Sequence, residues 1–231
     1  MTRREVVAAL TAGCASAYPS TPHGLTSLDG IDVLNAKAQA TNYRGQRCIR
    51  LLDSPNAEPN MTEGRKLGEQ RLVAILTRSH FQDGVIEAEL AGSPRAGTPQ
   101  ESARGFIGIA FRTQKDAARY ECFYLRPTNG RANDQLRRNH SVQYVSEPDF
   151  PWEKLRSETP GVYESYCDLE PGAWTKMKIE VSGIAAKLFV NGAAQPCLIV
   201  NDLKMGRTKG DIALWIGPET DGYFSNLKVT T

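Results

Sequence analysis

The stretch that decides the fold reads Pro171-Gly-Ala-Trp-Thr-Lys-Met-Lys-Ile-Glu-Val181 and continues shortly afterwards as Ala186-Lys-Leu-Phe-Val-Asn-Gly192. From Lys176 to Val181 charged and apolar residues alternate, which predicts a strand with one buried and one hydrated face. Asn191-Gly192 suits the positive φ angles of a two-residue type I′ turn, and the apolar run that follows completes a hairpin. This stretch therefore predicts an antiparallel sheet.

Similar short runs, separated by turn residues, continue through the chain from about Ile31. Long helical periodicity is nearly absent, and the polar residues 53–70 are expected to form a loop. Short strands without crossover helices predict one all-β sandwich domain over residues 31–231. The expected strands are Gln46–Leu52, Arg71–Thr77, Val85–Leu90, Gly105–Arg112, Tyr120–Arg126, Ser141–Val145, Val162–Leu169, Trp174–Val181, Ala186–Val190, Pro196–Val200, Asp211–Ile216 and Tyr223–Val229.

Length and charge restrict the class of protein. The chain has 231 residues, a length that suits a single large all-β domain. Its 28 basic and 26 acidic residues leave a net charge of +2, which argues against a nucleic-acid partner because such partners require a concentrated positive surface. No stretch approaches the roughly 20 apolar residues of a membrane span.

The N-terminus has the pattern of an export signal. Residues 1–17 begin with basic residues, continue with a short apolar run and end in small residues. Thr2-Arg3-Arg4 resembles a twin-arginine signal, and Ala12-Gly13-Cys14 resembles a bacterial lipoprotein cleavage site. Residues 18–30 are expected to be a linker. We therefore expect a bacterial type of exported protein that is periplasmic, secreted or lipid-anchored; a poorly packed terminus is the alternative.

The remaining cysteines do not form a metal-binding pattern. Cys48, Cys122, Cys167 and Cys197 show no Cys-x-x-Cys spacing, and the chain has only three histidines. A zinc site is therefore not expected. The four thiols are expected to be small buried apolar groups, with disulfides as the alternative in an exported protein.

Five segments resemble successive strands of the concanavalin A-like lectin/glucanase superfamily, near its 3-keto-disaccharide hydrolase and laminin-G-like branches. They cover about residues 75–229, and the resemblance implies an antiparallel jelly-roll β-sandwich. Because that superfamily contains lectins, hydrolases, lyases and adhesion modules, the resemblance does not choose among these functions. The segments are Phe81–Glu89, Gly105–Arg112, Arg119–Arg126, Pro171–Gly192 and Gly210–Val229.

Sandwiches of this superfamily often hold a sugar on one concave sheet face. Counting alternate residues outward from the apolar stripes predicts a set of aromatic and guanidinium side chains on that face. Aromatic rings stack on the C–H side of a pyranose, and guanidinium groups bond hydroxyls or carboxylates. The alternative is that these side chains pack beneath a loop or the N-terminal segment. The set is Arg112, Tyr120, Tyr124, Arg126 and Trp215.

The segment from Arg126 to Tyr144 is densely polar and is expected to form a binding rim. His140 and Gln143 would contribute to this rim, and Trp152 on the following loop would add a sugar platform. Arg126 could also neutralise the carboxylate of a uronic acid while His140 or Tyr144 moves a proton. The segment therefore supports either a lyase site or, as the alternative, a solvated loop.

Carboxylate pairs and metal ligands are weaker signals. Glu87 and Glu89 share one face of a strand and are expected to be hydrated, and Glu164 with Asp168 is a lesser candidate pair. No cofactor is expected apart from a structural Ca²⁺ ion, which the superfamily often binds through loop oxygens. The candidate but incomplete Ca²⁺ ligands are Asp221, Asn129 and Asp134.

These observations lead to one expected function and two alternatives. We expect an exported carbohydrate-interacting β-sandwich that binds a glycan on its concave sheet face. The first alternative is a glycan-cleaving enzyme, a glycoside hydrolase or polysaccharide lyase, that uses residues 126–144. The second is a structural or adhesion module without a sugar site.

Overall fold

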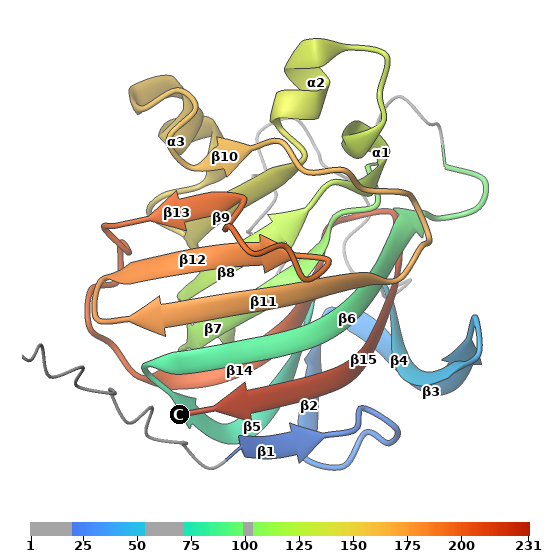
Figure 1. Cartoon of the computed structure of the whole chain (residues 1–231). Coiled ribbons are helices and arrows are strands. Elements are labelled where there is room, and N and C mark those ends of the chain that lie inside the picture. The colour runs from blue at the N-terminus through green and yellow to red at the C-terminus, as the bar shows by residue number, and fades with distance from the viewer. Residues whose placement is uncertain (1–19, 54–71, 99–103) are drawn as a thin grey trace, which may run out of the picture.

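The computed structural model describes residues 20–53, 72–98 and 104–231. The export-signal segment 1–17 and all but the first residue of the expected loop 53–70 lie outside these ranges. The described chain forms two antiparallel sheets packed face to face, as Figure 1 shows. The predicted all-β antiparallel sandwich is therefore confirmed.

The larger sheet has eight strands. Seven of these strands form the main path of the sheet, and β1 (Ser20–His23) pairs with β15 (Thr220–Thr230) beside it. In spatial order the main path is β13 (Leu198–Val200), β12 (Ala185–Val190), β11 (Thr175–Ser182), β6 (Gly84–Pro94), β15 (Thr220–Thr230), β4 (Gln46–Asp53) and β3 (Ala36–Tyr43).

The second sheet has seven strands, and three short helices lie at one end of the sandwich (Figure 1). Helices α1 (Pro127–Gly130) and α2 (Gln135–Asn139) connect β8 to β9, and α3 (Trp152–Glu158) connects β9 to β10. In spatial order the strands are β10 (Glu164–Ser165), β9 (Val142–Glu147), β8 (Tyr120–Leu125), β7 (Ile107–Thr113), β14 (Gly210–Ile216), β5 (Val73–Phe81) and β2 (Ile31–Leu34).

The strand periodicity read from the sequence is confirmed at the core. Apolar residues at alternate positions of β7, β8, β11 and β14 join one hydrophobic core between the sheets. In β11, for example, Met177, Ile179 and Val181 are buried while Lys176 is exposed. Because successive side chains of a strand point to opposite faces, this parity also assigns the other set of each strand to the outer face of its sheet.

The predicted type I′ turn does follow β12, because the Ala193 amide donates to the Val190 carbonyl at 3.1 Å, but the predicted two-residue hairpin loop is wrong. Asn191 and Gly192 do adopt positive φ angles of 53° and 73°, as an Asn-Gly pair favours. However, β13 begins only at Leu198, so the connection is several residues longer than a type I′ turn. Pro196, which has no N–H to donate, interrupts the ladder before Cys197 bonds to β12.

Part of the segment expected as a linker packs on the sandwich. β1 forms an antiparallel pair with β15, and Leu25 is fully buried in the core. The expected strand Val162–Leu169 is only two residues long, as β10. None of the helices in the described ranges is both long and apolar enough to traverse a bilayer.

Candidate functional site

Arg112 does not lie with the other predicted binding residues. Its guanidinium is fully buried and donates hydrogen bonds to the carbonyl oxygens of Gln82 (2.9 Å), Gly183 (2.7 Å) and Gly206. It also pairs with Asp83 at 3.1 Å. Arg112 therefore ties three loops together and is not available to a ligand, so its prediction as a sugar contact is wrong.

A β-bulge explains why counting alternate residues failed at Arg112. In the β7–β14 pair the register runs from Ala110 opposite Ala213 to Thr113 opposite Asp211, which leaves one extra residue in β7. Arg112 takes the bulged position with φ of 52°. A bulge redirects the side chain at the extra residue, and the one glycine of β7, Gly108, lies four residues before Arg112 and does not indicate a bulge there.

Tyr144 also points away from the predicted site. Its ring belongs to the core between the sheets, and its hydroxyl donates to the carboxylate of Glu121 and accepts from the Lys204 amide at 2.9 Å. Burial raises the pKa of this Tyr144 hydroxyl well above its usual value and also raises the pKa of the Glu121 carboxyl. Tyr144 is therefore a core residue, and its candidacy as a proton carrier is wrong.

The three outward aromatic residues lie together, as parity predicts, but they are covered. Tyr124 and Trp215 pack with ring centroids 4.9 Å apart, and the Trp215 indole donates to the Tyr120 hydroxyl at 3.2 Å. All three are at most 2% exposed, and Phe106 and Trp152 pack against their cluster. The prediction that these rings line an open face is therefore wrong; they form a floor beneath other side chains.

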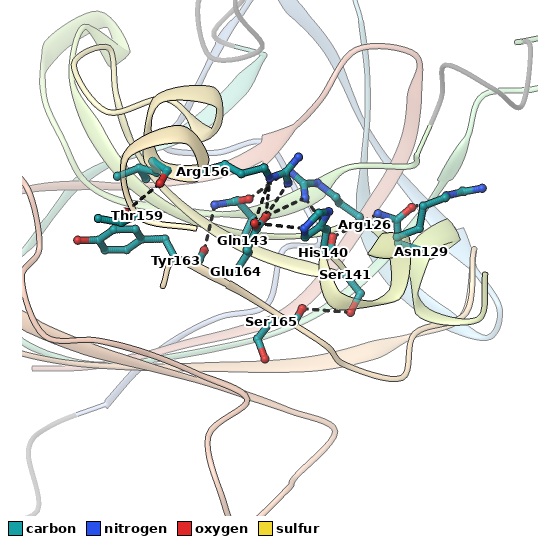
Figure 2. A network of polar contacts seen from close by, with 12 residues as sticks. Arg126, Asn129, His140, Ser141, Gln143, Arg156, Thr159, Tyr163, Glu164 and Ser165 are labelled. Atoms are coloured by element: carbon teal, nitrogen blue, oxygen red, sulfur yellow. Dashed lines mark hydrogen bonds and ion pairs between the residues drawn. The ribbon is translucent and has the colours of Figure 1, made fainter. Parts of the chain in front are cut away.

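A polar network lies at the β9–β10 end of this face, and Figure 2 shows how its side chains converge on one carboxylate. Glu164 is the centre: both of its oxygens lie 3.0 Å from Arg156 Nε, and Oε1 lies 3.2 Å from His140 Nε2. Arg126 Nη1 lies 3.9 Å from Oε2. We call Arg126, His140, Gln143, Arg156 and Glu164, with the adjoining Trp152, the Glu164 cluster.

Arg126 links this cluster to the aromatic floor. Its Nη2 donates to the Tyr124 hydroxyl at 2.7 Å and to Gln143 Oε1 at 3.3 Å, and its Nη1 donates to the His140 carbonyl at 3.1 Å. The guanidinium carbon also lies over the ring of Trp152 at 5.6 Å. Burial raises the pKa of Tyr124 to about 12, so this hydroxyl stays protonated. These contacts hold Arg126 in one orientation.

His140 is placed to act as a base. Glu164 accepts from Nε2, and no described residue hydrogen-bonds to the other ring nitrogen, Nδ1. Burial is the main cause that lowers the pKa of His140; Arg156 and Arg126 lower it further, while Glu164 opposes them. The imidazole is therefore neutral at pH 7, with a lone pair on Nδ1 that can accept a proton.

Only part of the Glu164 cluster reaches solvent. The Glu164 side chain is 4% exposed, whereas His140 is 18% and Arg156 is 29% exposed. Trp152 is half-buried, and the Arg156 guanidinium lies 4.5 Å from its ring centroid. A ligand would therefore meet an indole, a guanidinium and an imidazole at the mouth of a network whose carboxylate is buried.

Sequence reasoning brought together most of this cluster but missed Arg156. Arg126, His140, Gln143 and Trp152 were predicted, and Glu164 was only a lesser candidate. Trp152 is expected on a loop but begins α3, in which Trp152 and Arg156 are four residues apart and therefore share a face. The i, i+4 spacing was the signal that would have found Arg156.

The other predicted sites do not assemble. Asp168 is exposed and pairs with Arg131 at 2.9 Å, away from the Glu164 carboxylate. Glu87 and Glu89 lie partly exposed on β6, in the other sheet. The three candidate Ca²⁺ ligands do not come together, because Asp221 on β15 pairs with Arg50 whereas Asn129 and Asp134 both lie in the α1–α2 region.

Comparison with known proteins supports the architecture. No family model matches the chain, and no curated protein matches it in sequence. A carbohydrate-binding module (CBM66) from Bacillus subtilis superposes with a TM-score of 0.53 at 13% identity, over 87% of this chain and 96% of the module. A protein of unknown function with a galectin-like fold from Bacillus subtilis has a TM-score of 0.56 at 12% identity, over 91% and 94%.

A β-glucanase from Bacillus licheniformis has a TM-score of 0.51 at 13% identity, over 92% of this chain and 98% of the enzyme. These structures share the fold of this chain, and the antiparallel jelly-roll β-sandwich that the sequence resemblance implied is therefore confirmed. At such low identity the likeness concerns the fold, so the function has to be argued from the side chains.

Proposed function

We propose that this protein binds a carbohydrate at the exposed mouth of the Glu164 cluster. The observation that carries the proposal is the pairing of the half-buried Trp152 indole with the guanidinium of Arg156 and the imidazole of His140. An indole ring can pack on the C–H side of a sugar, while the two nitrogen groups bond its hydroxyls or carboxylates. Buried partners hold these groups in place, which limits the entropy that binding costs.

One finding from the comparisons and one from the structure support this proposal. The similar structures include a carbohydrate-binding module and a β-glucanase, two proteins whose names refer to glycans. The proposed site also lies on the outer side of the seven-stranded sheet, beside its aromatic floor. Because Tyr124 and Trp215 are covered, the ligand is expected to contact the rim residues and not the floor.

Replacing Trp152 by alanine is expected to weaken glycan binding about tenfold, because the site loses the indole ring on which the sugar would pack. Screening on a glycan array followed by calorimetric titration of the best ligand would measure the loss. Lys154→Ala on the same helix is the control, since Lys154 bonds to the Asp149 carbonyl and not to the cluster. An array without any bound glycan would contradict the proposal and favour a structural or adhesion module.

A second candidate function is cleavage of a glycan, and the Glu164–His140 pair is the observation that favours it. Glu164 accepts from Nε2 of His140, so Nδ1 could remove the C–H proton from the carbon that carries the carboxylate of a uronic acid. The electron pair of the broken C–H bond would form a carbon–carbon double bond as the bond to the linking oxygen breaks, and that oxygen would take a proton from water or from the imidazolium of His140. Arg126 or Arg156 would stabilise the charge that develops on the carboxylate.

If the protein is such an enzyme, His140→Gln is expected to lower the rate of cleavage at least 100-fold. The ultraviolet absorbance of the unsaturated product, or the appearance of new reducing ends, would report the rate. Because the pKa of His140 is lowered, activity should persist at pH 7 and fall only below the ordinary histidine pKa of about 6.5. Full activity of His140→Gln would remove His140 from the mechanism.

A further inference from the structure

We propose that the glycan bound at the Glu164 cluster is acidic: a sugar that carries a carboxylate, sulfate or phosphate group. This inference rests on the proposed function, because it names the class of ligand for the same site. It depends on two further arginines, Arg104 and Arg137, which place additional positive charge beside Arg126.

Short contacts connect both arginines to the cluster. Arg137 Nη2 donates to Asn129 Oδ1 at 3.4 Å, and the amide nitrogen of the same Asn129 side chain donates to the His140 carbonyl at 3.2 Å. The Arg104 carbonyl accepts hydrogen bonds from the Thr128 amide at 3.4 Å and hydroxyl at 3.3 Å. α1 and α2 therefore gather Arg104 and Arg137 next to Arg126 and His140.

The charges in this region do not balance. The Glu164 carboxylate already pairs with Arg156, His140 and Arg126, and it is the one buried carboxylate of the cluster. The other carboxylate that acts on His140 is Asp134, which caps α2 by accepting from the Arg137 amide at 2.9 Å. Among the described residues, the guanidinium groups of Arg126, Arg137 and Arg156 therefore face two carboxylates, so positive charge remains in excess even without Arg104.

Two observations indicate that this excess is directed toward a ligand. Burial lowers the pKa of Arg104, and the nearby charges of Arg137 and Arg126 lower it further, so the three guanidinium groups repel one another. Arg137 Nε is buried and has no hydrogen-bond partner among the residues that the structure describes. An anion among these groups would relieve the repulsion and accept from that donor. In contrast, Arg131 is exposed and is already paired with Asp168 and Glu170.

Paired ligands that differ only in charge provide the test. We would titrate oligogalacturonate against its methyl ester, and chondroitin sulfate oligosaccharides against their desulfated backbone. The acidic member of a pair is expected to bind at least tenfold more tightly at low salt, and its affinity should fall as sodium chloride is raised from about 50 to 300 mM. The neutral member should depend little on salt.

Two variants locate the effect. Arg137→Gln and Arg104→Gln should each weaken binding of the acidic ligand several-fold while leaving that of the neutral ligand nearly unchanged. Arg131→Gln removes the same charge from the same surface region and is the matched control, which should change neither affinity. Thermal unfolding would confirm that each variant is folded. Equal weakening by all three variants would overturn the inference, because the preference would then reflect overall charge.

The outcomes separate this inference from the proposed function. Equal or tighter binding of the neutral ligands would overturn the acidic class and leave glycan binding standing. If neither member of any pair bound, and the glycan array were also empty, both would fall. An acidic preference that Arg137→Gln abolishes and Arg131→Gln preserves would support both.

Discussion

Replacing Arg112 by alanine is expected to lower the free energy of unfolding by about 4 kcal/mol. The guanidinium is fully buried and bonds to the carbonyls of Gln82, Gly183 and Gly206. Alanine would leave these carbonyl acceptors unpaired and Asp83 with only its bond from the Gly183 amide, around a cavity the size of the lost side chain. Urea unfolding followed by tryptophan fluorescence would measure the change.

A graded series makes this test specific. Arg112→Lys is expected to lose most of the same stability, because one ammonium group cannot span three carbonyl oxygens as a planar fork does. Arg119→Ala is the control, since Arg119 is more than half exposed and its pair with Asp149 is screened by solvent. If Arg112→Ala were as stable as Arg119→Ala, the connecting role of Arg112 would be refuted.

Replacing Glu164 by glutamine is expected to lower the free energy of unfolding by about 3 kcal/mol. The carboxylate is buried between Arg156 and Arg126, so the amide keeps the shape but leaves the Arg126 charge without its counterion. The same change would release His140, whose Nε2 is held by Glu164. Denaturant unfolding would measure the loss of stability. Calorimetric titration with the best glycan from the array would show whether binding is also weakened.

Asp168→Asn is the matched control for Glu164. Asp168 makes the same kind of carboxylate–guanidinium pair with Arg131, but both side chains are more than half exposed. Exposed pairs contribute little, so this variant should unfold like the parent protein. A Glu164→Gln protein that is as stable as Asp168→Asn would mean that Arg126 does not need its counterion, and the cluster would lose its organising centre.

Most of the sandwich could be predicted from the sequence because strand periodicity is a local property. Alternation in β11 and β14 identified the residues of the core, and the same counting put Tyr124 and Trp215 on the opposite face. Errors arose where a local rule was broken. The bulge in β7 redirected Arg112, and the helical turn of α3 replaced an expected loop.

The candidate site was harder to predict because its members come from separate segments. His140 follows α2, Arg156 lies on α3 and Glu164 begins β10, and no spacing in the chain shows that the three converge. Nor does periodicity reveal whether an outward ring is open to solvent. Trp215 lies on the outer face as expected, yet Tyr124 and other residues bury it to 2% exposure.

Local patterning was thus sufficient for the antiparallel sandwich and for the side of the sheet that most residues occupy, since both follow from the two-residue repeat of a strand. The packing of distant segments alone determined which aromatic rings are covered, and that Arg126, Arg156 and His140 share the buried carboxylate of Glu164. Burial and charge pairing depend on neighbours in space, and these neighbours are brought together only when the sheets and the helices at their end pack against each other.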